Sequence, residues 1–289
     1  MKWPNSVKTT RFTSINRQST WTTSRMSSHP TNPARTLNDS RQDAELFFVF
    51  TQLDFISNIT AFTDICLSPS LKEIHGFLNR PATINIVHEL FPVFSYSKTI
   101  TYQDVLYPSP WYWSDQVSWK EKKNKFYWRG KTIGGYSKGG TWRRHHRQSF
   151  VSRINAVDTT KVMKDVSASA AGTEWVVEEV PRTDYKELIN VKLTQVTLCD
   201  PEDYNAQHQS FEVVKPSKEE AWQYKYLLDI DGNTFSGRFY ALLKSMSLVF
   251  KIALFREWHL ANSMGALHTP KFERGRACGE YTILQRGAR

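Results

Sequence analysis

The chain has 289 residues, which suits one large domain or two smaller ones. Hydrophobic residues make up 40% of it, including ten tryptophans, so most of the chain can bury a core and a wholly disordered protein is excluded. The formal net charge of +10 favours a polyanionic or phosphate-bearing partner, or it reflects surface composition alone.

The first part of the chain divides into a tail and a set of short elements. Residues 1–42 are rich in Ser, Thr, Asn, Arg and Pro, which predicts a disordered tail. They contain no signal peptide core, and no segment of the chain reaches the roughly 18 apolar residues of a membrane span. Short elements are expected up to residue 120: a strand at 45–50, a helix or two at 63–78, short elements at 84–90 and 93–95, and a proline-rich aromatic loop at 107–113.

A charged stretch at residues 120–125 is predicted to separate two halves of the chain. The second half is expected to run through an aromatic strand and Gly/Thr-rich loop at 126–136, a helix at 142–154, a strand at 190–198 and a capped helix start at 216–222. Within it, the run Arg143-Arg144-His145-His146-Arg147 is interpreted as a solvated or phosphate-facing basic surface. Adjacent helical positions point about 100° apart, so the two histidines do not share a metal.

Residues 225–250 carry the most informative pattern in the chain, a strand, a turn, a helix and a second strand. Ser236, Gly237 and Arg238 fall at the expected helix start, beyond the carboxyl end of the first strand. Free backbone N–H groups at a helix start attract phosphate, and arginine grips two phosphate oxygens at once. The alternative is an ordinary strand-turn-helix unit that binds no ligand, as in many α/β domains.

Two other residue sets have metal or redox interpretations. Asp229 and Asp231 alternate along the expected strand and point the same way, so a divalent ion shared with a diphosphate is one interpretation. A structural aspartate at the strand end is favoured over it. The three cysteines, Cys66, Cys199 and Cys278, have no metal-ligand spacing, and their odd number leaves at least one thiol free.

Three segments together resemble glycosyltransferase family 90, the family of fungal capsule-associated proteins and of protein O-glucosyltransferases with KDEL-type ends. They are PVFSYSKT at 92–99 with YQDVLYP at 102–108, FYWRGKT at 126–132, and YKYLLDIDG, SGRF and SLVF within 224–250. The resemblance covers roughly residues 45–259. It ends there because no closing segment of the family type follows Glu257-Trp258, so residues 260–289 are expected to form an irregular basic tail on an incomplete C-terminal half.

The resemblance implies an α/β protein of GT-B type, with two Rossmann-like halves. Residues 43–125 would form the acceptor side and residues 126–259 would bind the nucleotide sugar. The implied activity is transfer of glucose or xylose from a UDP-sugar to a glycan or protein hydroxyl, with inversion, in the Golgi or ER lumen and without a required cofactor. By similarity, the nucleotide-sugar contacts are Arg129, Gly130, Thr132, Ser236, Gly237 and Arg238, with Arg238 on the diphosphate.

An inverting transferase needs a base that deprotonates the acceptor hydroxyl, and a carboxylate is the usual choice. Asp54, just after the early apolar strand, is the nearest match to the family's base. The alternative is that Asp54 caps a turn. Two other functions compete with the transferase: a non-catalytic remnant of the family, and a basic nucleic-acid-binding protein suggested by the net charge and the basic run at 143–147.

Overall fold

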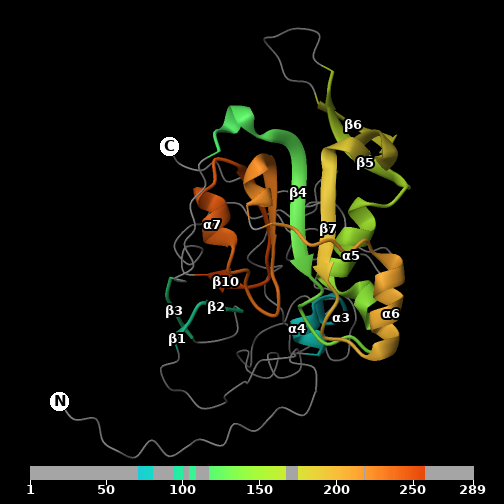
Figure 1. Ribbon diagram of the computed structural model, residues 1–289, viewed down its shortest axis with the longest axis vertical. Helices are drawn as coiled ribbons and strands as arrows, with labels where there is room; N and C mark the ends of the chain where they lie inside the picture. The colour runs from blue at the N-terminus through green and yellow to red at the C-terminus, as the bar shows by residue number, and fades with distance from the viewer. Residues whose placement is uncertain are drawn as a thin grey trace, which may run out of the picture.

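The structure is a computed structural model that describes residues 71–80, 94–99, 104–108, 117–166, 175–217 and 219–257. At its centre lies a parallel four-stranded sheet in the order β7-β4-β8-β9 (Figure 1). Its strands are β4 (Lys123–Lys131), β7 (Ile189–Gln195), β8 (Tyr224–Ile230) and β9 (Leu248–Ile252). The protein is therefore of the α/β class. The predicted tails, the strand at 45–50 and Asp54 lie outside the described residues.

The direction in which successive strands are added to the sheet reverses once. β4 comes first in the chain yet lies inside the sheet, with β7 on one side and β8 on the other. In chain order the four strands are thus 2-1-3-4, and the winding direction reverses between β4 and β8. Open α/β sheets bind their ligands outside the carboxyl ends of the strands at such a switch point.

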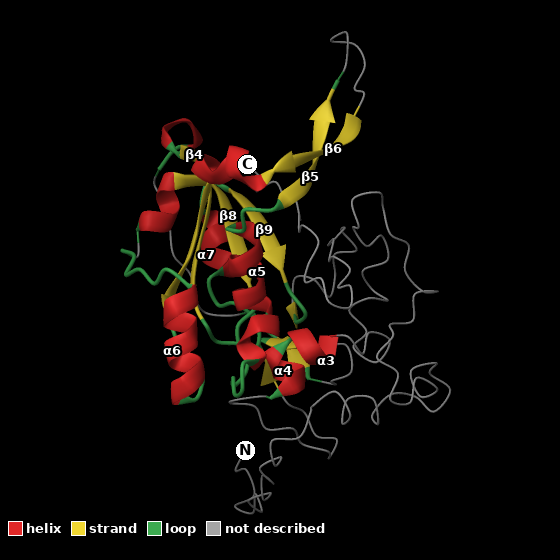
Figure 2. Ribbon diagram, turned by 90° about the vertical axis from the view of Figure 1, so that its right-hand side faces the viewer, coloured by secondary structure: helices red, strands yellow, loops and turns green. Residues whose placement is uncertain are grey.

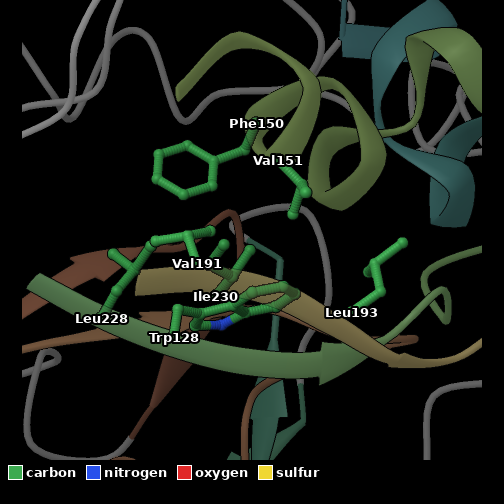
Figure 3. Close-up of a cluster of buried hydrophobic side chains, with 7 residues drawn as sticks. All are labelled: Trp128, Phe150, Val151, Val191, Leu193, Leu228 and Ile230. Atoms are coloured by element: carbon green, nitrogen blue, oxygen red, sulfur yellow. The ribbon is translucent and has the colours of Figure 1, made fainter. Parts of the chain in front are cut away.

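Helices cover both faces of the sheet because neighbouring residues of a strand point to opposite sides. Helix α5 (His146–Ile154) covers the face that carries Trp128, and Figure 3 shows its Phe150 and Val151 facing that side chain. Helix α7 (Phe239–Lys244) packs through its own apolar residues on the opposite face, which carries Tyr127. The sheet is therefore doubly wound, and both of its faces are buried.

Two elements of the second half have no counterpart among the sequence-based expectations. One is an antiparallel hairpin, β5 (Thr159–Asp165) and β6 (Trp175–Pro181), that projects beyond the sheet (Figure 2). A 3-10 helix, Arg182–Leu188, follows it and leads into β7. The other is α6 (Pro201–Ser210), which begins with an Asp N-cap and a proline in the first turn.

The N-terminal helices and short strands lie at the carboxyl edge of the sheet, the helices below β4 and β7 and the strands below α7 in Figure 1. They are α3 (Leu71–Ile74), α4 (Gly76–Asn79), β1 (Phe94–Ser95), β2 (Ser97–Lys98) and β3 (Val105–Leu106). β1 pairs with β3, and β2 pairs with β10 (Arg256–Glu257), which follows β9. The segment after β9 thus joins the N-terminal elements to the sheet domain.

Three expectations about element boundaries were wrong. The aromatic strand expected from residue 126 begins earlier, because residues 119–121 of the charged stretch form a 3-10 helix and β4 already begins at Lys123. The helix expected over 142–154 is divided into a 3-10 helix, Thr141–Arg144, and α5. The capped helix start near 216–222 is only a short 3-10 helix, Glu220–Gln223.

The sheet core predicts that two leucines, one just before β7 and one within it, contribute very differently to the free energy of unfolding. Leu193 is fully buried, whereas Leu188 is 44% exposed. We expect Leu193→Ala to lower the free energy of unfolding by about 2–5 kcal/mol, because it leaves a cavity. Leu188→Ala should stay within about 0.5 kcal/mol of wild type. Urea unfolding of both variants measures this, and equal losses would contradict the assignment of β7 to the core.

Candidate functional site

The loops after β4 and β8 meet at the switch point of the sheet. The backbone N–H of Gly134 donates a hydrogen bond to Asn233 Oδ1 at 3.0 Å, which ties one loop to the other. Gly134 has a φ of 123°, and a Cβ on it would lie 2.4 Å from the His146 ring. Glycine is thus required there both by its backbone conformation and by the closeness of α5.

The side chain of Arg147 fills the space between the ends of β4 and β8. Its Nη1 donates to the carbonyl oxygen of Lys131 at 3.0 Å, and its Nη2 donates to that of Ile230 at 2.7 Å. Its Nε donates to the carbonyl oxygen of Asp231, also at 2.7 Å. One guanidinium from the first turn of α5 therefore satisfies the last carbonyls of both strands at the switch point.

Arg147 is a buried cation, only 4% exposed. Burial, together with the nearby charge of Arg238, lowers the pKa of the guanidinium to about 9, while Asp229 and Asp231 act in the opposite direction. The group keeps its charge at neutral pH. The expected solvated basic run is therefore wrong for its second half: Arg143 and Arg144 are exposed, but the remaining three residues are buried.

Carboxylates and a lysine form a second buried ionic group at this edge. Lys251 Nζ lies 2.8 Å from Asp229 Oδ2 and 2.8 Å from Glu257 Oε1, and all three side chains are almost fully buried. The backbone N–H groups of Leu254 and Phe255 donate to Asp231 Oδ2 at 2.7 and 3.0 Å. These contacts fix the segment after β9 against β8, so both aspartates of the metal interpretation have structural partners.

The burial of this group changes its proton affinity. Burial raises the pKa of Asp231 to about 7, although Lys251 and the N–H of Phe255 oppose the change. Burial also raises the pKa of Glu257, again against Lys251. Within the described part of the chain, no cluster of three or more His, Cys, Asp or Glu side chains is arranged to hold a metal ion.

Three neutral histidines surround the same edge. His75, which precedes α4, stacks on His146 with ring centroids 4.2 Å apart, and His146 Nε2 lies 2.8 Å from the carbonyl oxygen of Asp231. Burial lowers the pKa of His75 to about 3, that of His145 to about 4 and that of His146 well below its usual value. All three are therefore uncharged at neutral pH.

The first set of predicted site residues, Arg129, Gly130 and Thr132, makes its contacts within the sheet domain. Arg129 is buried on the α7 face, where it donates to the Asn190 carbonyl oxygen at 2.9 Å and to Glu220 Oε1 at 3.3 Å. Thr132 Oγ1 donates to the Thr197 carbonyl at 3.0 Å and accepts from the Thr197 N–H at 2.8 Å. Gly130 lies against the Trp128 ring, which a Cβ would approach to 2.5 Å.

The second set lies between β8 and α7. Ser236 is buried and its carbonyl accepts from the Phe239 N–H at 3.2 Å, whereas Arg238 is exposed. Arg238 Nη1 donates to the backbone carbonyl of Arg129 at 2.6 Å. The structure thus brings the two predicted motifs together through that hydrogen bond. The helix that follows, α7, has only six residues. The Arg238 side chain is therefore a stronger candidate for a phosphate contact than the start of this helix.

Sequence reasoning missed the most central residue of this edge. Arg147 was read as one of several basic residues, because a run of charges gives no sign of which member turns inward. The signal that could have separated it is the apolar pattern of the following helix, which places residue 147 on the same side as Phe150 and Val151.

The fold and the edge define an α/β protein with a doubly wound parallel sheet and a glycine-rich switch point lined by arginines. No family model matches the chain, and no curated protein matches it. In the described ranges, none of the helices is both long enough and apolar enough for a bilayer span. Of the three cysteines, Cys199 lies within the described residues and is a free, partly buried thiol.

Removal of the Arg147 side chain should destabilise the protein strongly. Arg147→Ala removes the guanidinium donors from the buried carbonyls of Lys131 and Ile230, and each buried acceptor left unsatisfied costs about 1–3 kcal/mol. Arg144→Ala, which removes an exposed charge from the same run, should cost less than about 1 kcal/mol. Urea unfolding compares them. If Arg147→Ala unfolds at the same urea concentration as Arg144→Ala, the guanidinium does not hold the strand ends.

The buried titrating groups predict a specific pH dependence of stability. The histidines titrate at a pKa of about 6.5 when unfolded but remain neutral in the fold, so the unfolding free energy falls as pH falls below about 6.5. Asp231 works in the opposite direction, because its folded pKa of about 7 exceeds its unfolded value and the folded state holds more protons from about pH 4 to 7.

Replacing Asp231 by asparagine separates the two effects. Asp231→Asn keeps an acceptor oxygen for the amides of Leu254 and Phe255 but no longer titrates. The loss of unfolding free energy between pH 7 and pH 5 should therefore be larger in this variant than in wild type. Urea unfolding at the two pH values measures it, and equal losses in the two proteins would contradict the raised pKa of Asp231.

Proposed function

We propose that this protein binds the diphosphate of a UDP-sugar at the switch point between β4 and β8 and acts as an inverting glycosyltransferase of GT-B type. The observation that carries the proposal is the position of Arg238. It is an exposed arginine at the carboxyl edge of a doubly wound sheet, held to the end region of β4 by its hydrogen bond to the Arg129 carbonyl. This is where α/β sheets bind phosphorylated ligands.

The electrostatics of the edge support an anionic ligand. Arg147 and Arg238 lie close enough for each charge to affect the other, as the lowered pKa of Arg147 indicates. Since Arg147 is buried and bound to three backbone carbonyls, Arg238, which is exposed, is the member of this pair that a diphosphate can reach. A guanidinium can bind two phosphate oxygens in a fork while it keeps one contact to the protein.

The resemblance to glycosyltransferase family 90 supplies the rest of the proposal. It assigns residues 126–259 to the nucleotide side and residues 43–125 to the acceptor side. The contacts of Arg129 and Thr132 modify this assignment: their side chains would organise the site from behind rather than touch the nucleotide. Asp54 remains the proposed base. The sugar, glucose or xylose, and its acceptor are part of the proposal, as is a location in the secretory pathway.

A second proposal is a family relative that binds UDP without turnover. The internal use of Arg129 and Thr132 favours it, because fewer side chains remain for the donor than the family motif implies. The two proposals agree on UDP binding and differ in the release of UDP from UDP-sugar in the presence of acceptor. The nucleic-acid proposal loses its main support, since the basic run at 143–147 turns partly into the core.

The role of Arg238 predicts a loss of nucleotide affinity. Arg238→Ala should weaken UDP binding by about 1.5–3 kcal/mol, the range for a hydrogen bond to a charged group. Lys186→Ala is the matched control, because Lys186 is exposed just before the amino end of β7, at the opposite edge of the sheet. Calorimetric titration with UDP measures both variants. Equal UDP affinities of folded Arg238→Ala and the control would reject the diphosphate site.

A further inference from the structure

An aromatic cluster adjoins the arginine edge and has no role in the account so far. It consists of Tyr96, Tyr107 and Phe235. The ring of Tyr96 lies between the other two, with centroid distances of 4.6 Å to Tyr107 and 5.7 Å to Phe235. The rings are tilted by 42° and 47° instead of being stacked flat on one another.

The cluster is partly open to solvent, unlike the aromatic residues of the sheet core. Tyr107 is 37% exposed and the other two rings are half-buried. Next to it, the cross-strand pair Phe94 and Val105 is 66% and 47% exposed. Large apolar side chains gathered at the surface beside polar groups are typical of a binding surface.

Polar contacts hold the segments of the cluster together. Tyr107 N–H donates to the Ser95 carbonyl at 3.2 Å, and the Ser95 hydroxyl donates to Asp104 Oδ2. Lys98 Nζ donates to the Asp104 carbonyl at 2.9 Å. The hydroxyls of Tyr96 and Tyr107 also interact, and this hydrogen bond is the main cause of the raised pKa of Tyr107. The rings are thus positioned before any ligand arrives.

The cluster is close to the proposed diphosphate site by chain geometry. Phe235 precedes Arg238 by three residues in the same loop, so their Cα atoms are at most about 11 Å apart. The loop follows β8, and the elements that carry the tyrosines lie at the same edge of the sheet, below α7 in Figure 1. A group attached to a diphosphate on Arg238 can therefore reach the rings.

We infer that Tyr96, Tyr107 and Phe235 form the subsite for the pyranose ring of the donor sugar. This inference rests on the proposed function and adds the part of the ligand that the rings recognise. A pyranose presents an apolar C–H face and a rim of hydroxyls. The aromatic rings can pack against the C–H face. The paired tyrosine hydroxyls can form hydrogen bonds with the sugar hydroxyls, since tyrosine combines an apolar body with a polar tip.

The chemistry of the cluster favours a sugar over a nucleobase. A base stacks best on a face parallel to it, whereas the ring of Tyr96 is tilted against both of its neighbours. A cluster with hydroxyls at its surface also suits a ligand with many hydroxyls, because each must be offered a hydrogen bond when water is displaced. The base alternative is kept as an outcome of the test.

The test compares UDP-glucose with UDP for the same variants of the full chain, by calorimetry. Tyr107→Ala and Phe235→Ala should each weaken UDP-glucose binding by at least about tenfold, equal to about 1.4 kcal/mol, and change UDP binding by less than about twofold. Tyr185→Ala is the matched control, because Tyr185 is 38% exposed and lies at the opposite edge, in the 3-10 helix before β7. Tyr107→Phe, which keeps the ring, should retain most of the affinity.

The outcomes separate this inference from the proposed function. If wild type binds UDP but the ring variants bind UDP-glucose as wild type does, the subsite is wrong and the diphosphate site stands. If UDP and UDP-glucose weaken equally, the rings hold the base and the sugar assignment is overturned. If wild type binds neither ligand, the proposed function fails and the subsite fails with it.

Discussion

One buried guanidinium holds the switch point of this protein together. The carboxyl ends of two adjacent parallel strands bring backbone carbonyl oxygens close together, and burying such groups without donors would cost free energy. Arg147 supplies donors to both strand ends and to Asp231 from the first turn of α5. This contact joins the first turn of α5 to the carboxyl ends of both strands.

The same edge concentrates charge that the protein must neutralise internally. Lys251 balances Asp229 and Glu257, and the proton affinity of Asp231 rises so far that it is partly protonated near neutral pH. The buried histidines add no charge. Several buried polar atoms at this edge, including both ring nitrogens of His75 and Oδ1 of Asp231, have no hydrogen-bond partner in the described part of the chain. Such costs are usually tolerated at functional sites.

Part of the sheet could be predicted from the sequence, because β8 and β9 overlap the two apolar runs that were expected to form strands in residues 225–250. The coarse class was also predictable from alternating strands and helices. The role of Arg147 was not, since the direction of one charged side chain in a basic run depends on packing across the sheet. For the same reason Arg129 was expected to face a ligand, whereas pairing with β7 and Glu220 directs it into the protein.

The hairpin β5–β6 was missed because it carries mixed polar and apolar residues on both sides.

The central claim is that a nucleotide diphosphate binds at the edge between β4 and β8, and amide hydrogen exchange with and without UDP tests it most directly. The account predicts slower exchange on UDP addition in the loops at residues 132–136 and 232–238, with no change in α6 or in the hairpin β5–β6. Unchanged exchange in both loops at a saturating UDP concentration, or protection confined to another part of the sheet, would contradict it.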